Sequence, residues 1–202
     1  MRVGIFGGTF DPPHYGHLAL AVAARDELGL DMVLWVPAAD PPHKQDRPIS
    51  LAVDRLAMVQ AAIADQPGFE LSRIDVDRPG PHWTADTVAL LAEHYPGAEL
   101  VFVMGGDSLR DLPTWGRPQE IVDCCLLGVL RRPGDAVDLP ALEAVLPGLT
   151  AKVRFIDEPP IATSAHDIRE RIRAGLPIWG LVPPPVAEII ARRGLYRDTG
   201  LA

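Results

Sequence analysis

Two histidines at helical spacing, His14 and His17, follow a pair of glycines, Gly7 and Gly8, in the string GGTFDPPHYGH. The string comes directly after an apolar run at residues 3–6, which predicts a strand, a glycine turn and the first turn of a helix. Residues three apart share one face of a helix. A helix N-terminus also presents unpaired N–H donors and a partial positive charge, both of which favour phosphate. Two imidazoles above such a site indicate chemistry on phosphate groups.

A simpler interpretation of the same residues involves no ligand. A strand, two glycines and a helix are common turn chemistry, and a histidine near a helix start is often a cap or a solvated side chain. The complete string is more specific, because the glycines, the pair Pro12 and Pro13 and the H-x-G-H spacing coincide. Glycines without a Cβ also let a ligand approach the backbone closely. We therefore interpret the string as a phosphate site.

The length and composition of the chain limit its class. With 202 residues, 48% of them hydrophobic, we expect one compact domain over residues 1–202, with a small helical part from about residue 160. No apolar run approaches the ~20 residues of a membrane span, and the first residues enter a strand without a signal-like segment. Cys124 and Cys125 are adjacent and cannot build a disulfide framework. We expect buried thiols and a cytoplasmic protein with no membrane partner.

The net charge of −8 argues against nonspecific binding to nucleic acid. A protein that handles phosphate at this charge must gather positive charge locally. Exposed arginines on a helix usually form a solvated face, so a basic residue is a functional candidate here because of its position within a motif. The candidates are His43, Lys44, Arg131, Arg132, Arg169, Arg171 and Arg173.

Short apolar runs alternate with helical patterns along the chain. The runs lie at residues 3–6, 32–36, 100–104, 126–130 and 153–156. This alternation predicts an α/β fold, a Rossmann-like doubly wound parallel sheet with helices on both faces. Ligands of such sheets lie beyond the carboxyl ends of the strands, where the strand order switches. We expect the Gly7-Gly8 and Gly105-Gly106 turns at that edge.

The expected helices are bounded by capping signals. The first helix spans about residues 17–28 and stops at Gly29, the second has Ser50 as its N-cap, and the third spans about residues 84–94. The fourth helix begins near Ser164 and ends at Gly175. The last helix follows residues 183–185 and ends at Gly194, and its residues Val186, Ile189 and Ile190 are expected to pack inward.

Further motifs follow the first in a characteristic order. They are PPHK at residues 41–44, WTADT at 83–87, GGDSLRDLPTW at 105–115, RRPG at 131–134, SAHDIRERI at 164–172 and GLYR at 194–197. In order and approximate spacing the set resembles the bacterial nicotinate-nucleotide adenylyltransferases, of the H-x-G-H nucleotidyltransferase superfamily. The resemblance covers nearly the whole chain. It implies transfer of AMP from ATP to nicotinate mononucleotide, giving deamido-NAD and pyrophosphate, in NAD biosynthesis.

The resemblance also implies how the phosphates are held. The mononucleotide phosphate would attack the α-phosphorus of ATP in line, without a covalent enzyme intermediate. His14 and His17, either protonated or in the donor tautomer, would donate to phosphate oxygens, and Lys44 would neutralise charge. Arg169 would hold the β- and γ-phosphates, and Mg²⁺ is expected on the triphosphate with few or no protein ligands. The implied ATP-binding residues are Gly7, Gly8, Thr9, Phe10, Gly105, Asp107, Arg132, Ser164 and Ile168.

Two of the implied roles have structural alternatives. Asp107 would accept from the ribose hydroxyls, or cap the helix that follows it. Trp115 would be the platform for the nicotinate ring, or an anchor in the core. Thr84 and nearby N–H groups would bind the nicotinate carboxylate, and Arg132 would add charge or hold the adenine side. The implied mononucleotide-binding residues are His43, Lys44, Trp83, Thr84 and Trp115.

Two positions depart from the family pattern. His166 stands where a threonine is usual, which puts one hydroxyl contact in doubt. Trp83 replaces a frequent tyrosine, which keeps an aromatic wall but loses the phenol.

Three rival interpretations explain less. A related transferase, for instance one acting on phosphopantetheine, leaves WTADT and LPTW unexplained. A non-catalytic nucleotide-binding module predicts that the histidines are dispensable. A nicotinamide-dependent dehydrogenase needs G-x-G-x-x-G, which the glycines Gly4, Gly7 and Gly8 do not form. The oligomeric state stays open, a homo-oligomer included.

Overall fold

A parallel β-sheet forms the centre of the molecule in the computed structural model, which describes residues 1–39, 49–131, 137–157 and 163–197. Within these residues the sheet has six strands in the order β3-β2-β1-β4-β5-β6, all paired in parallel. This is the doubly wound order, with its switch between β1 and β4, so the predicted fold class is confirmed. The strands are β1 (Arg2–Gly8), β2 (Met32–Pro37), β3 (Phe69–Leu71), β4 (Glu99–Gly105), β5 (Leu126–Arg131) and β6 (Val153–Asp157).

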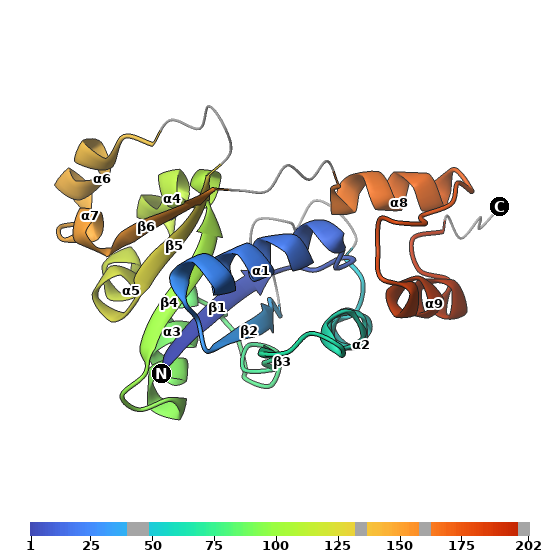
Figure 1. Ribbon diagram of the computed structural model, residues 1–202, viewed down its shortest axis with the longest axis horizontal. Helices are drawn as coiled ribbons and strands as arrows, with labels where there is room; N and C mark the ends of the chain where they lie inside the picture. Colours follow the sequence, from blue (N-terminus) through green and yellow to red (C-terminus); the bar gives the residue numbers. More distant parts are fainter. Residues whose placement is uncertain (40–48, 132–136, 158–162, 198–202) are drawn as a thin grey trace.

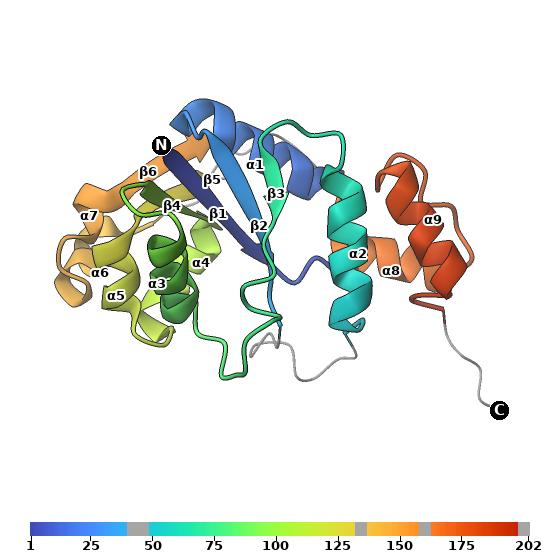
Figure 2. The same ribbon diagram turned by 90° about the horizontal axis from the view of Figure 1, so that it is seen from below.

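Both faces of the sheet are buried, which is why its strands read as continuous apolar runs. Along β1, Val3 and Ile5 join one core cluster, whereas Phe6 joins the other. The cluster around Phe6 includes residues of α1 (Tyr15–Leu28), α2 (Ala52–Ile63), α8 (Ala165–Arg173) and α9 (Pro184–Arg193). The opposite cluster includes residues of α3 (Thr84–His94), α4 (Gly106–Asp111), α5 (Pro118–Cys124), α6 (Leu139–Val145) and α7 (Leu149–Lys152). Figure 2 shows α1 on one side of the sheet and α3 and α5 on the other.

Most predicted helix boundaries are confirmed by their caps. α1 ends at Gly29, which adopts a left-handed φ of 59°, and α9 ends at Gly194 with a φ of 63°. α3 has the predicted bounds. α8 begins after Ser164, whose Oγ accepts from the backbone N–H of Asp167 at 3.1 Å. The three residues Val186, Ile189 and Ile190 of α9 are buried as expected.

Some predictions at this level are wrong. Ser50 does not cap α2: the N-cap is Leu51, without a side-chain bond, and the backbone N–H of Ser50 instead donates to Asp11. Cys125 is buried, but Cys124 is exposed. The sequence reading also missed β3 and several short elements, because they have too few residues to show a period. These are the 3₁₀ turn η2 (Leu112–Thr114) and the helices α5, α6 and α7. A helix at Asp107, by contrast, was expected and is present as α4.

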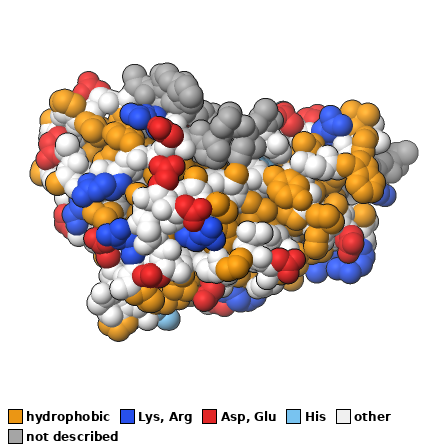
Figure 3. Space-filling view, in the orientation of Figure 1, with side chains coloured by type: hydrophobic (Ala, Val, Ile, Leu, Met, Phe, Trp, Pro, Cys, Tyr) orange, Lys and Arg blue, Asp and Glu red, His pale blue; other side chains and the backbone are white. Residues whose placement is uncertain are grey.

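The C-terminal helices α8 and α9 lie together at one end of the molecule (Figure 1). They share the core cluster of α1 and α2, through Ile168 and Val186 among others. In the view of Figure 3 hydrophobic side chains gather toward this end, while acidic and basic side chains are interspersed elsewhere. The part of the chain that the structure describes contains no helix long and apolar enough to cross a membrane.

Candidate active site

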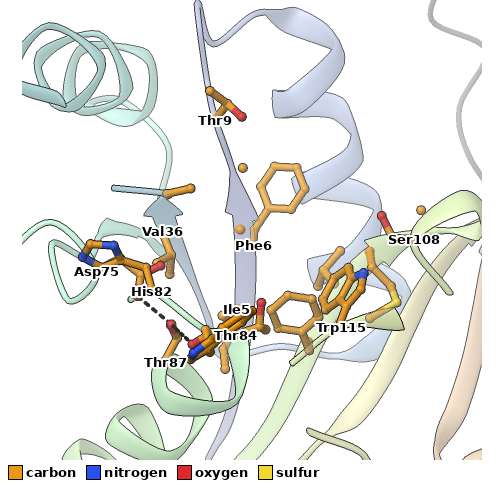
Figure 4. Close-up of a pocket in the computed structure, with 18 of the residues that line it drawn as sticks. Ile5, Phe6, Thr9, Val36, Asp75, His82, Thr84, Thr87, Ser108 and Trp115 are labelled. Atoms are coloured by element: carbon orange, nitrogen blue, oxygen red, sulfur yellow. Dashed lines mark hydrogen bonds between the residues drawn. The ribbon is translucent and has the colours of Figure 1, made fainter. Parts of the chain in front are cut away.

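A cavity of about 700 Å³ opens where β1 and β4 end. Gly7 and Gly8 line it from β1, and Gly105 lines it from the end of β4. Both glycine turns therefore meet at the predicted edge, because β1 and β4 are neighbours at the switch in strand order. Figure 4 shows Thr9 above this edge, with Trp115 and Ser108 on one side, Asp75, His82 and Thr87 on the other, and Thr84 between them.

The two histidines are joined by a reciprocal capping box at the start of α1. The Nδ1 of His14 accepts from the backbone N–H of His17 at 3.3 Å, and the Nδ1 of His17 accepts from the backbone N–H of His14 at 3.3 Å. The rings lie side by side, with their centroids 3.7 Å apart and their planes at 30°. In a neutral imidazole one nitrogen accepts and the other donates, so each neutral ring carries its proton on Nε2. The capping box thus selects the donor tautomer at both positions.

Burial keeps His14 uncharged. Its residue surface is only 6% exposed, and loss of solvation lowers the pKa of His14 from 6.5 to about 4. Of the two forms that the sequence left open, the structure therefore selects the neutral donor tautomer for His14 at pH 7. His17 lines the cavity, whereas His14 does not. His17 is thus the histidine that faces the cavity, and His14 is the helix cap beside it.

Aromatic packing supports the histidine pair from below. Phe10, at a positive φ of 50°, is buried with its ring centroid 5.1 Å from that of His17 and 5.0 Å from that of Trp35. A Cβ added at Gly8 would lie 2.8 Å from the Phe10 ring, so the turn needs glycine there. The side chain of Phe10 belongs to the core, and any contact of this residue with ATP rests on its backbone.

The predicted phosphate residues of α8 lie outside the cavity lining. Arg169 is buried, and its Nη1 donates to the backbone carbonyl of Asp11 at 2.6 Å. Ile168 is 0% exposed and packs in the core, so its side chain serves packing. Ser164 caps α8, and its Oγ donates to Asp167 at 2.7 Å. The hydrogen bond of Arg169 therefore links α8 to the β1–α1 loop.

Trp115 and the start of α3 form another wall of the cavity. Thr84 is the first residue of α3, so the unpaired N–H groups of that helix end lie beside it. Trp83 precedes it, and its ring covers Gly116, where a Cβ would lie only 2.4 Å from the ring. Trp115 lines the cavity while its ring packs edge-on against Phe102 at 6.1 Å between centroids. Trp115 thus packs against the core and also lines the cavity.

A buried polar network holds this wall, and the sequence reading missed it. Asp75 and Thr87 are buried, and the hydroxyl of Thr87 donates to Asp75 at 2.5 Å. Arg78 donates to the same Asp75 oxygen at 3.1 Å and to the backbone carbonyl of Trp83 at 3.3 Å. His82 lines the cavity, with its Nε2 3.0 Å from the carbonyl of Arg78. Thr87 belongs to the WTADT motif, but nothing in the sequence indicated its partners.

Asp107 lies apart from the cavity lining. Its side chain is 74% exposed and forms an ion pair with Arg110. The N-cap of α4 is Gly105, so the alternative that Asp107 caps this helix is wrong. Three predicted residues, His43, Lys44 and Arg132, lie outside the described residues. The predicted residues that line the one cavity are Gly7, Gly8, Thr9, His17, Trp83, Thr84, Gly105 and Trp115.

Comparisons with known proteins agree with the fold. The model of the cytidylyltransferase-like family matches residues 5–171. A solved structure of Plasmodium falciparum nicotinic acid mononucleotide adenylyltransferase complexed with NaAD has a TM-score of 0.75 at 18% identity, covering 96% of this chain and 97% of that one. That likeness concerns the fold. Sheet, cavity and histidine pair together define a nucleotidyltransferase of the cytidylyltransferase-like class.

Curated relatives narrow the class further. A probable nicotinate-nucleotide adenylyltransferase of Thermomicrobium roseum is 50% identical over 97% of this chain and 92% of its own length. One from Roseiflexus sp. is 44% identical over 96% of this chain and 98% of its own length. The chain belongs to the nicotinate-nucleotide adenylyltransferase family.

The lowered pKa of His14 predicts a loss of stability in acid. The unfolded chain binds a proton below about pH 6.5, whereas the folded state resists protonation of His14 down to about pH 4. Stability is therefore highest above pH 6.5 and falls as the pH drops to 4, by on the order of 3 kcal/mol from this group. His14→Asn retains a side chain that caps helices well but does not titrate. Urea unfolding of both proteins from pH 4 to 8 should show a steeper acid loss in the wild type; parallel curves would contradict the assignment.

Proposed function

We propose that this enzyme transfers AMP from ATP to nicotinate mononucleotide, giving deamido-NAD and pyrophosphate in NAD biosynthesis. The observation that carries the proposal is the capped histidine pair. It places the His17 ring on the wall of a cavity that Trp115 and Thr84 also line. A phosphate-handling group and a flat aromatic group with hydrogen-bond donors thus share one cavity of about 700 Å³. Two nucleotides that react with each other need such a shared space.

The reaction requires no protein nucleophile. A phosphate oxygen of the mononucleotide forms a bond to the α-phosphorus of ATP, and the bond from that phosphorus to the bridging oxygen breaks as pyrophosphate leaves. The enzyme's task is to align the two polyanions and to stabilise charge on the phosphate oxygens. His17 donates from Nε2 to a phosphate oxygen, and His14 holds the helix end from which His17 projects. A neutral donor needs no proton uptake before the reaction.

In this proposal, arginine and lysine side chains supply the positive charge, and the neutral His14–His17 pair does not. Arg169 interacts with the β- and γ-phosphates in our proposal, and its Nη1 also donates to the backbone carbonyl of Asp11. We propose that Lys44 and Arg132, whose roles rest on the family resemblance, add positive charge to the phosphate site. Gly7, Gly8 and Thr9 bring backbone close to the phosphates at the start of α1.

Magnesium enters as part of the substrate, Mg-ATP. Mg²⁺ keeps several waters and is commonly held through substrate phosphates. Among the residues that the structure describes, no group of three or more His, Cys, Asp and Glu side chains could hold a metal ion. We propose that phosphate and water hold Mg²⁺, with few or no protein ligands. Bound to the triphosphate, it would neutralise phosphate charge.

Adenosine and nicotinate occupy different parts of the site in this proposal. The turn at Gly105 lets the adenosine approach closely, and Asp107 accepts from the ribose hydroxyls once its carboxylate turns from Arg110. Trp115 stacks with the cationic pyridinium ring. Thr84 and the N–H groups at the start of α3 bind the nicotinate carboxylate. The substrates are soluble nucleotides, and we propose a cytoplasmic location.

Pyrophosphate release from ATP with three acceptors tests the proposed function. We expect turnover with nicotinate mononucleotide and little with phosphopantetheine, while nicotinamide mononucleotide falls between them. His17→Ala should lower turnover by about 10²-fold or more, because a positioned donor to the transition state is lost. His17→Gln restores an acceptor for the His14 N–H, so its thermal stability should exceed that of the alanine variant. Near-normal turnover in a folded His17→Ala protein would refute the role of the histidine.

Acceptor preference tests the carboxylate site at Thr84. In nicotinamide mononucleotide the amide NH₂ would face a protein N–H or O–H donor that binds a carboxylate oxygen in the acid. That donor would be left without an acceptor, which costs about 1–3 kcal/mol of binding free energy. We expect kcat/KM of the wild type to be about ten- to a hundredfold higher for the acid than for the amide. Thr84→Val should lower kcat/KM for the acid more than for the amide, whereas Thr150→Val on α7 changes neither. Equal losses for both acceptors, or a wild type that prefers the amide, would contradict this assignment.

A further inference from the structure

The carboxylate of Asp11 is buried in the β1–α1 loop, three residues before His14. It is 3% exposed, and both of its oxygens accept hydrogen bonds. The hydroxyl of Tyr196 donates to Oδ1 at 2.7 Å, and the backbone N–H of Ser50 donates to Oδ2 at 3.3 Å. Buried carboxylates need such partners, so these two bonds stabilise the loop in this position.

Tyr196 reaches this loop from the other end of the chain, 185 residues away in sequence. Gly194 ends α9 in a left-handed conformation and turns the chain, and Tyr196 itself has a φ of 65°. Its hydroxyl also lies 3.8 Å from the Sδ of Met58 on α2. Burial, followed by the negative charge of Asp11, raises the pKa of Tyr196 far above its usual range. The hydroxyl therefore remains a donor at neutral pH.

Other bonds secure the same loop and its surroundings. Arg55 is buried on α2 and donates to the backbone carbonyls of Thr9 and Ser50, both at 3.0 Å. Arg169 donates to the carbonyl of Asp11 itself. Tyr196 differs from these arginines because it bonds the loop through one neutral hydroxyl, which a single conservative substitution removes.

We propose that Tyr196 is a positioning residue for the His14–His17 pair and acts through the carboxylate of Asp11. This inference rests on the proposed function, since it assigns the histidines to the reaction. Without the hydroxyl, Asp11 keeps one donor to its carboxylate, and the loop that ends at His14 shifts to reach water. The His17 ring then moves relative to the reacting phosphates, although no residue of the cavity has changed. The closing GLYR motif thus has a part in catalysis.

Steady-state kinetics of Tyr196→Phe test the proposal. A displaced donor lowers kcat, so we expect a loss of about tenfold or more while the KM for nicotinate mononucleotide stays within about twofold. Tyr95→Phe removes a hydroxyl from the C-cap of α3 and serves as the matched control with unchanged kcat. A purely structural role predicts a lower melting temperature with wild-type kcat in the folded protein. That result would overturn the proposal.

A double-mutant cycle shows whether Tyr196 acts through Asp11. Asp11→Ala removes the buried charge, so adding Tyr196→Phe leaves no carboxylate unpaired, even if the single Phe variant unfolds. We expect the second substitution to lower kcat by less than about twofold in that background; independent losses that multiply would refute the coupling.

A readout independent of turnover separates this inference from the proposed function. In ¹⁵N-labelled protein, the ring signals of His14 and His17 should shift in Tyr196→Phe and stay unchanged in Tyr95→Phe. A wild type that forms no deamido-NAD would refute the proposed function alone, and the ring signals would still test the positioning role. Unchanged ring signals would refute the positioning role alone.

Discussion

The reciprocal hydrogen bonds between His14 and His17 are the constraint on which the rest of the site depends. Each ring accepts from the other residue's backbone N–H through Nδ1, so neither ring can rotate without uncapping α1. The surrounding structure supports this arrangement: Phe10 packs against His17, and Asp11 fixes the approach of the chain. Helix start, ring orientation and tautomer are therefore set together. The two rings are therefore preorganised, which is the condition for strong electrostatic stabilisation in the reaction that we propose.

The neutrality of His14 changes how the site must handle charge. Two polyanions meet in a protein of net charge −8, yet the buried imidazole at the helix cap does not carry a charge at neutral pH. The N-termini of α1 and α3 contribute positive potential through their helix dipoles. The helix ends face one cavity because parallel strands direct them to the same edge of the sheet. The fold thus supplies part of the electrostatics that its side chains lack.

Local patterns in the sequence predicted every strand except β3, most helix caps and the glycine turns, because each depends on neighbours within a few residues. Motif membership did not predict where side chains point: Phe10 and Ile168 lie in the core although they belong to motifs expected to bind ATP. Contacts between distant segments were also beyond reach. Nothing near Asp75 indicated its bonds to Thr87 and Arg78, and only the fold brings Tyr196 to Asp11. Ser50 resembled a helix cap, but its backbone serves the loop instead.

The protonation site of the two rings is the most direct test of this account. Long-range ¹H–¹⁵N correlation spectra of the ¹⁵N-labelled protein at pH 8 report which ring nitrogen carries the proton, and His14→Asn and His17→Gln assign the signals among the six histidines. The account predicts that both His14 and His17 are neutral with the proton on Nε2. A proton on Nδ1 of either ring would contradict it, because that nitrogen could not then accept the backbone hydrogen bond that holds the pair.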